Sequence, residues 1–236
     1  MLRIRKSQDR GHRSTDWLQS WFTFSFDQYR DPAHIHWNSL RVINEDIIAP
    51  GMGFGMHPHH DMEIISFVIS GALRHQDNLG NTAILKPGEI QRMTAGTGIM
   101  HSEFNPDAKI PTHMLQIWIM PAQNDQTPSW EQIRWTDLPE FASGLKLIAS
   151  PDGRDRSATI GQDATVWHVG PSKTLIHLPL DSSRKAWLQV ATGTAIIEDA
   201  TSTLHLAAGD GVAISEEMEI KVTSSSDDFS ALCFVL

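Results

Sequence analysis

Short apolar runs separated by turn-forming residues recur along the whole chain of 236 residues. Most runs are about four to nine residues long and rich in Val, Ile, Leu and Thr, as is typical of strands. Turns such as Lys86-Pro87-Gly88 and Ala208-Gly209-Asp210 separate them. No segment keeps a helical apolar period between two caps. The pattern predicts an all-β protein of sandwiches or barrels, with Asp16–Ser20 and Ser129–Arg134 as short helix candidates.

The chain divides at a polar, turn-prone stretch between residues 121 and 138. A weak repeat on its two sides supports two similar halves. In each half an apolar run ends in Gly, and a second run ends in a Gly-plus-acid turn. The spacing between these glycines is 17 residues from Gly71 to Gly88 and 16 residues from Gly193 to Gly209. We therefore expect two β domains, comprising residues 1–132 and 133–236.

Charge and cysteine content exclude several classes of protein. There are 19 Lys and Arg against 28 Asp and Glu, a net charge of −9, which argues against a nucleic-acid partner because phosphate contacts need a basic surface. The only cysteine, Cys233, excludes an internal disulfide and a zinc site of several thiolates. The sequence contains no apolar run of membrane-spanning length and no secretory signal pattern. We expect a cytoplasmic protein without membrane partners.

Two clusters of histidine and glutamate residues are candidates for a metal site. His57 and His59 are two residues apart, so on a strand both imidazoles point to one face, about 7 Å apart. His101 and Glu103 show the same spacing. Glu63 has the parity of His57 and His59 and should face the same side if the strand continues regularly. Three imidazoles and one carboxylate predict a single metal site, and the spacing leaves both Glu63 and Glu103 as candidate ligands.

The donor set suits Fe(II), Mn(II), Ni(II), Cu(II) or Zn(II). Zinc is less favoured, because three His and one Glu would close its tetrahedron and leave no open position. Histidine pairs also arise by chance in a chain with 12 histidines. His34 and His36 form such a pair, which we interpret as ordinary surface or loop residues. Gln116 lies within an apolar run, where it either hydrogen-bonds a metal ligand or is a satisfied core amide.

Several motifs resemble those of the pirin family, within the cupin superfamily. They are Gly53–His59, Met62-Glu63, Ala95–Glu103 and Leu115–Trp118. The resemblance covers most of the chain and is greatest to the bacterial pirin-like quercetin dioxygenases. It implies a bicupin, with a metal-binding cupin barrel in residues 1–132 and a degenerate cupin barrel without metal in residues 133–236.

The resemblance also implies the residues of the site. In pirins the metal ligands occupy the positions of His57, His59, His101 and Glu103, which leaves Glu63 as a nearby catalytic base. One divalent transition metal is implied, with Fe(II) preferred and Mn(II), Ni(II), Cu(II), Zn(II) or Co(II) as alternatives. The second half agrees, because Gly193–Ile214 contains no pair of histidines two residues apart and His205 stands alone in it.

The function implied by the resemblance is a metal-dependent dioxygenase that cleaves flavonols such as quercetin with O2 and releases carbon monoxide. The substrate would be a small aromatic compound whose hydroxyl proton passes to Glu63 or Glu103, and we expect a monomer. A rival interpretation is a non-enzymatic metal- or redox-sensing module that binds other proteins, as proposed for eukaryotic pirins. A third is a cupin isomerase or decarboxylase, which oxygen consumption would distinguish.

Overall fold

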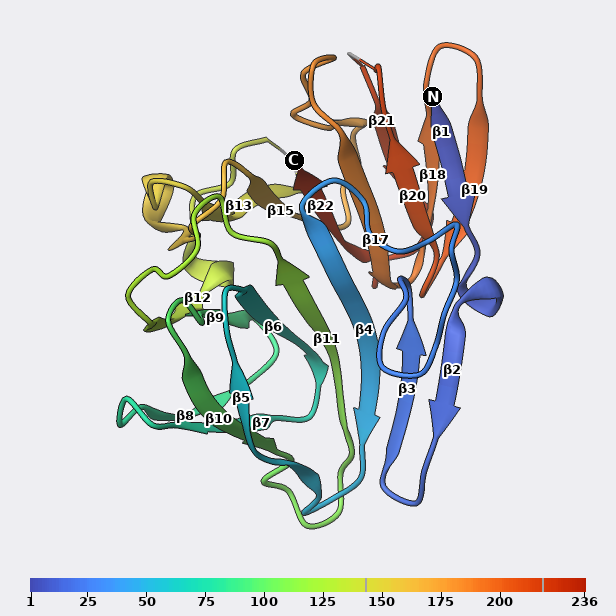
Figure 1. Ribbon diagram of the computed structural model, residues 1–236. Coiled ribbons are helices and arrows are strands. Elements are labelled where there is room, and N and C mark those ends of the chain that lie inside the picture. Colours follow the sequence, from blue (N-terminus) through green and yellow to red (C-terminus); the bar gives the residue numbers. More distant parts are fainter. Residues whose placement is uncertain (143, 218) are drawn as a thin grey trace. The chain divides into compact units, whose positions relative to one another are not determined.

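Nearly all regular structure in the computed structural model is β, and the model describes residues 1–142, 144–217 and 219–236 (Figure 1). Helical structure in these ranges is limited to short 3₁₀ turns at Ser7–Asp9, Trp135–Asp137 and Arg154–Arg156. The predicted all-β class is confirmed. The two helix candidates are wrong, because Ser129–Arg134 and Leu18–Phe22 are strands. Ser129–Arg134 pairs along its whole length with Glu89–Thr94, so ladder hydrogen bonds override its local propensity.

The chain forms two compact units that interleave along the sequence. Unit 1 comprises Met1–Arg10, Leu138–Ser157 and Ala164–Leu236, and unit 2 comprises Gly11–Asp137 and Ala158–Asp163. The first strand, β1 (Leu2–Arg5), belongs to unit 1 because it pairs antiparallel with β20 (Gly211–Ile214). No local pattern signals a pairing between opposite ends of the chain. The single junction between residues 132 and 133 stays a sequence prediction.

Unit 2 consists of two antiparallel sheets. The larger has the strand order β12-β9-β6-β11-β4-β3-β2, and the smaller has the order β5-β10-β7-β8. The strands are β2 (Gly11–Ser14), β3 (Leu18–Phe22), β4 (Leu40–Ile48), β5 (Gly53–His59), β6 (Glu63–Ser70), β7 (Leu73–Asp77), β8 (Thr82–Leu85), β9 (Glu89–Thr94), β10 (Ile99–Phe104), β11 (Thr112–Ile119) and β12 (Ser129–Arg134).

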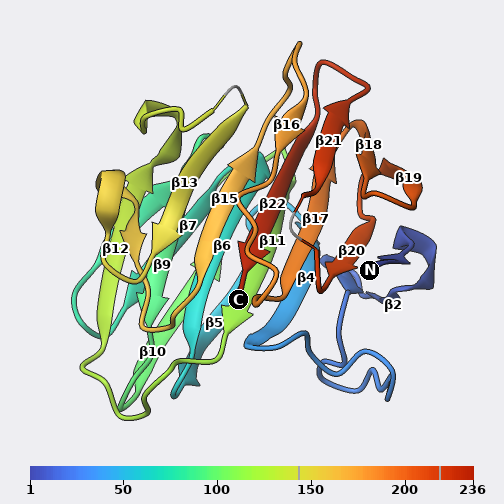
Figure 2. The same cartoon turned by 90° about the horizontal axis from the view of Figure 1, so that it is seen from above.

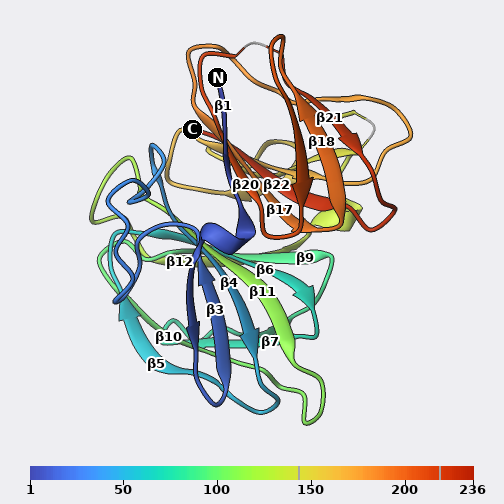
Figure 3. The same ribbon diagram turned by 90° about the vertical axis from the view of Figure 1, so that its right-hand side faces the viewer.

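The two sheets of unit 2 pack face to face (Figure 3). Ile48, Val68 and Met114 of the larger sheet form one buried cluster with Leu73 and Leu85 of the smaller sheet. Side chains alternate between the faces of a strand, so residues of the same parity as these point into the same interior. The interior of unit 2 is therefore apolar at this end.

A row of polar side chains interrupts this apolar interior. Asn44, Gln116, Ser66 and Gln91 are cross-strand neighbours on β4, β11, β6 and β9. Asn44, Ser66 and Gln91 are at most 5 % exposed. Burying polar groups is unfavourable unless each is hydrogen-bonded. A row of buried polar side chains across the inner face of a sheet therefore indicates a functional site.

Unit 1 also contains two sheets. One has the order β1-β20-β17-β22-β15-β13, and part of this order is visible in Figure 2. The other has the order β16-β21-β18-β19. The strands not yet given are β13 (Leu145–Ser150), β15 (Thr165–Val169), β16 (Ile176–His177), β17 (Ala186–Thr192), β18 (Thr194–Glu198), β19 (Thr203–Ala207), β21 (Lys221–Ser224) and β22 (Ser230–Val235), and the short β14 (Ala158–Thr159) belongs to unit 2.

The core of unit 1 is apolar and includes the single cysteine. Val190, Ile197, Val222 and Cys233 lie in one buried cluster. Burial raises the pKa of the Cys233 thiol to about 12, so this side chain packs as a small apolar group. None of the described helical segments is long and apolar enough to cross a membrane.

Candidate metal centre

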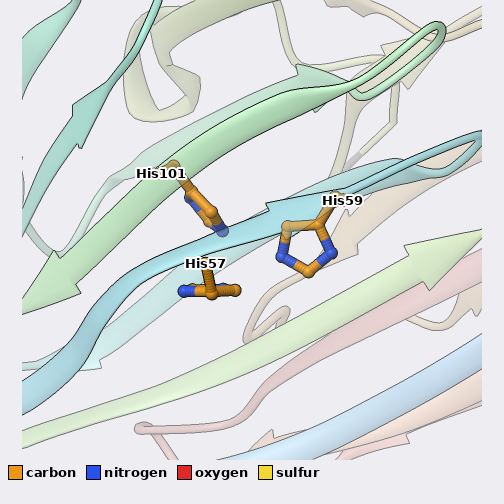
Figure 4. Close-up of side chains that lie close together, drawn as sticks. All are labelled: His57, His59 and His101. Atoms are coloured by element: carbon orange, nitrogen blue, oxygen red, sulfur yellow. The ribbon is translucent and has the colours of Figure 1, made fainter.

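Strands β5 and β10 bring His57, His59 and His101 together in the interior of unit 2. His57 lies directly opposite His101 in the antiparallel pair, and alternation along β5 places His59 on the same face. Figure 4 shows the three rings gathered around one point. One ring nitrogen of each histidine lies within 4.8 Å of those of the other two. The clusters singled out in the sequence therefore meet in space.

The protonation of these rings suits metal ligation. Burial, with repulsion from neighbouring histidines, lowers the pKa of both His59 and His101 to about 3, so both are neutral at pH 7. The Nδ1 of His57 lies 2.7 Å from the carbonyl oxygen of Gly55 and donates to it, which leaves Nε2 with its lone pair. His101 Nε2 is buried and has no hydrogen-bond partner in the part of the chain that the structure describes. Neutral imidazoles with unpartnered nitrogens fit a bound metal ion.

A hydrogen-bonded chain behind His101 fixes its orientation. Asp77 Oδ2 lies 3.0 Å from His75 Nε2, and His75 Nδ1 lies 3.5 Å from His101 Nδ1. A carboxylate accepts, so His75 donates from Nε2 and accepts at Nδ1, and His101 then donates from Nδ1. Burial alone would raise the pKa of Asp77, but hydrogen bonds from His75 and Asn81 outweigh burial and lower it. The chain directs the His101 Nε2 lone pair toward His57 and His59.

We expect Asp77→Asn to weaken metal binding about tenfold to a hundredfold, the usual effect of losing a hydrogen-bond partner of a metal ligand. The new amide can donate to His75 Nε2, which makes His75 donate to His101 Nδ1. The proton of His101 then moves to Nε2 and blocks the lone pair. Competition with a chelator, followed by isothermal titration with Ni(II), would measure the affinity.

The matched control for this prediction is Asp125→Asn, which removes a carboxylate whose side chain is 74 % exposed. Its Ni(II) affinity should equal that of the wild type. An unchanged affinity in Asp77→Asn would mean that the hydrogen-bonded chain does not set the state of His101.

Glu103 lies beside the histidines but is not part of their 4.8 Å group. Its carboxylate falls within 4.8 Å of ring nitrogens of His75 and His101, and it is 1 % exposed. Ser66 Oγ donates to Oε1 at 2.9 Å, and Gln116 Nε2 donates to Oε2 at 2.7 Å. Gln116 therefore hydrogen-bonds one of the candidate ligands, the first of its two predicted roles. These two hydrogen bonds fix the orientation of the Glu103 carboxylate in the interior.

The structure places Glu63 away from the three histidines. Its Oε2 accepts a hydrogen bond from Thr94 Oγ1 at 2.9 Å, and a Cβ at Gly161 would lie 2.9 Å from its Oε1. Ser66, which donates to Glu103, has the opposite parity on β6 and therefore points to the other face of the sheet. The prediction that Glu63 faces His57 and His59 is wrong. Residues 60–62 form a turn between β5 and β6, with Asp61 at φ 48°, and parity is not carried through a turn.

A cavity of about 260 Å³ opens beside the histidines. His57, His59 and Glu103 lie at one part of its wall. The remaining polar wall comes from β2, β3, β4, β11 and the segment between β3 and β4, and the apolar wall contains several aromatic rings. The lining residues are Arg13, Leu18, Ser20, Phe22, Phe26, Asp27, Asn44, Asp46, Phe54, His57, His59, Glu103, Gln116 and Trp118.

Several residues near the histidines were not predicted from the sequence to belong to the site. His75 and Asp77 have the same two-residue spacing as His101 and Glu103, a signal that was available. Asn44 and Asp46 lie two residues apart within the apolar run 40–48. Buried polar residues in such a run are unusual and indicate a functional role. His34 and His36, by contrast, contact Asp31 and the carbonyl of Asn38 and do not line the cavity.

Comparison with known proteins assigns both halves of the chain. The family model Pirin matches residues 3–119, and the model of the quercetinase C-terminal cupin domain matches residues 147–236. A protein of Escherichia coli K12 named quercetin 2,3-dioxygenase is 42 % identical over 229 residues, which make up 96 % of this chain and 95 % of the relative. The chain belongs to the pirin family. The resemblance seen in the sequence is thereby confirmed.

Solved structures agree with this assignment of the pirin fold. The crystal structure of YhhW from Escherichia coli has a TM-score of 0.92 and 40 % identity, and the match covers 100 % of this chain and 97 % of that one. The same bacterial pirin in complex with nickel(II) has a TM-score of 0.91 and 41 % identity, with coverage of 100 % and 99 %. The predicted bicupin fold is confirmed.

Proposed function

We propose that this pirin is a metal-dependent dioxygenase that cleaves flavonols such as quercetin with O2 and releases carbon monoxide. The observation that carries the proposal is the convergence of His57, His59 and His101 beside a cavity that is lined by two of these histidines and by aromatic rings. The names of its relatives, at 42 % identity over nearly the whole chain, support an enzyme of this class. Small-molecule sites are concave and largely apolar with a few convergent polar groups, as this cavity is.

The metal would be a divalent transition ion held by His57, His59, His101 and Glu103, a donor set that suits several first-row metals, and the resemblance to the family favours Fe(II). A pirin relative is described in complex with nickel(II), so Ni(II) is an alternative. When bound, the ion supplies a positive charge that lowers the pKa of a substrate hydroxyl beside it.

The side chains of unit 2 would bind and orient the flavonol. Phe22, Phe26 and Trp118 line the cavity, and the ring centroids of Phe26 and Trp118 are 5.4 Å apart in an edge-to-face arrangement. Such surfaces suit a flat aromatic ligand and exclude water from it. Gln116 and Ser66 hold the Glu103 carboxylate, so little of this wall has to reorganise when substrate arrives.

Metal loading combined with an aerobic flavonol assay tests the proposed function. Protein loaded separately with Fe(II) or Ni(II) should bleach quercetin in air, consume one O2 per flavonol and release carbon monoxide. No bleaching should occur without O2. Protein that holds metal but leaves quercetin and O2 unchanged would contradict the proposal and favour the sensor interpretation. Turnover of a substrate without loss of O2 would favour an isomerase or decarboxylase.

A further inference from the structure

Two buried polar side chains of β4 line the cavity. Asn44 and Asp46 are 5 % and 4 % exposed and share the cavity wall with His57, His59 and Glu103. They alternate on one face of β4, while Glu45 between them points to the other face and contacts His113 at 2.8 Å. A buried amide and a buried carboxyl side by side are unfavourable unless partners are supplied.

The partners present in the protein do not satisfy both groups. Asn44 Oδ1 is buried and has no hydrogen-bond partner among the described residues, so it can accept a hydrogen bond from a ligand in the cavity. Ser20 Oγ donates to Asp46 Oδ1 across the β3–β4 pair, where the two residues lie opposite one another. This hydrogen bond fixes the orientation of the Asp46 carboxyl group beside the cavity.

The surroundings of Asp46 change its pKa in a way that suits proton transfer. Burial raises its pKa to about 7, and the negative charges of Glu103 and Glu45 act in the same direction. The hydrogen bond from Ser20 and the charge of His113 oppose the rise. A carboxyl group that titrates near neutral pH inside a substrate cavity is suited to general acid–base catalysis.

We propose that Asp46 is the general base of this site and takes the proton of a substrate hydroxyl, while Asn44 Oδ1 accepts a hydrogen bond from a neighbouring hydroxyl. The proposal rests on the proposed function and narrows the substrate to aromatic compounds with two adjacent hydrogen-bond donors. The substrate O–H bond breaks, its electron pair stays on the substrate oxygen, and the proton passes to a carboxylate oxygen of Asp46. The resulting anion is the form that a metal at the three histidines attracts.

Asp46 fits this role better than the two glutamates. Both oxygens of Glu103 already accept hydrogen bonds from Ser66 and Gln116, and its charge is needed to hold a cation. Glu63 faces the other side of the larger sheet. Asp46 is the remaining carboxylate that lines the cavity together with His57 and His59, apart from Asp27, whose Oδ2 is paired with Arg13 Nη1 at 2.6 Å.

The test measures metal content, anaerobic quercetin binding and aerobic turnover of Asp46→Asn. Metal content should match the wild type. Bound quercetin should show the absorption of the neutral flavonol instead of the red-shifted anion, and kcat should fall about 10²- to 10⁴-fold, as for loss of a positioned base. Glu45→Gln, on the other face of β4, should match the wild type in metal content and in the anionic absorption of bound quercetin. Asn44→Leu should raise the quercetin Kd about fivefold to tenfold through loss of one hydrogen bond.

Ser20→Ala keeps the carboxylate and tests the proposal if Asp46→Asn fails to fold. The Ser20 hydrogen bond lowers the pKa of Asp46, so its loss should raise this pKa and move the acid limb of the kcat–pH profile to higher pH. An anionic spectrum and wild-type kcat in Asp46→Asn, or an unmoved profile in Ser20→Ala, would overturn the proposal. Wild-type protein that neither binds nor consumes quercetin would overturn the proposed function as well, which distinguishes the two failures.

Discussion

His57→Ala should lose most of the bound metal, with metal content about tenfold or more below that of the wild type. The substitution removes one of three imidazoles whose nitrogens lie within 4.8 Å of one another. His57 is only partly buried at the cavity wall, so its loss should leave the fold intact. Atomic absorption on protein loaded with Fe(II) or Ni(II) and then washed with chelator would measure the difference.

His34→Ala is the control for this prediction. His34 also belongs to a pair of histidines two residues apart, but its Nδ1 contacts Asp31 Oδ2 at 2.7 Å and the ring does not line the cavity. Its metal content should equal that of the wild type. The same metal content in both variants would place the metal outside the group of three histidines.

The convergence of the histidines could be predicted because it depends on the most regular property of a strand. His57 and His59 share a face by alternation, and so do His101 and Glu103. What the sequence could not provide was the register that sets His57 opposite His101. That register arises from long-range packing of the two sheets. In the sequence analysis, only the resemblance to the pirin family placed the two histidine clusters in one site.

The role of Glu63 could not be predicted, since alternation applies only within one strand. The turn at residues 60–62 separates β5 from β6 and contains Asp61 in the left-handed region. A change of one residue in phase moves a side chain to the other face of a sheet. Asp46 presents the opposite case: it lies on a different strand from the histidines of the site, and only the assembled sheet brings β4 to the cavity.

Glu103 and Glu63 are both buried carboxylates, but their surroundings differ in a way that predicts different functions. Glu103 receives hydrogen bonds from Ser66 and Gln116, and it lies in the interior with the histidines. Glu63 is fully buried against Thr94 and Gly161, and burial raises its pKa. The donors to Glu103 orient its carboxylate beside the histidines, where it can hold a cation. At Glu63, burial outweighs the hydrogen bonds from Thr94 and Gly161 and favours the neutral acid.

Glu103→Gln should therefore lower metal affinity about tenfold to a hundredfold and reduce quercetin turnover with it. The amide keeps the shape of the side chain but removes the negative charge beside the three imidazoles. Its NH2 group would also face a donor, either Ser66 or Gln116, where the carboxylate accepted a hydrogen bond. Ni(II) titration and turnover of the metal-loaded protein, measured side by side, would show both effects.

Glu63→Gln is the matched variant, since it makes the same chemical change in a buried glutamate on the other face of the larger sheet. Thr94 can keep its hydrogen bond to the amide oxygen, so the local packing should persist. We expect the metal content and the turnover of the wild type. If Glu63→Gln empties the site while Glu103→Gln keeps it, the carboxylate ligand is Glu63, and the arrangement of β6 must change when metal binds. If neither variant alters metal content or turnover, the three histidines act without a carboxylate, and the dioxygenase proposal loses its fourth ligand.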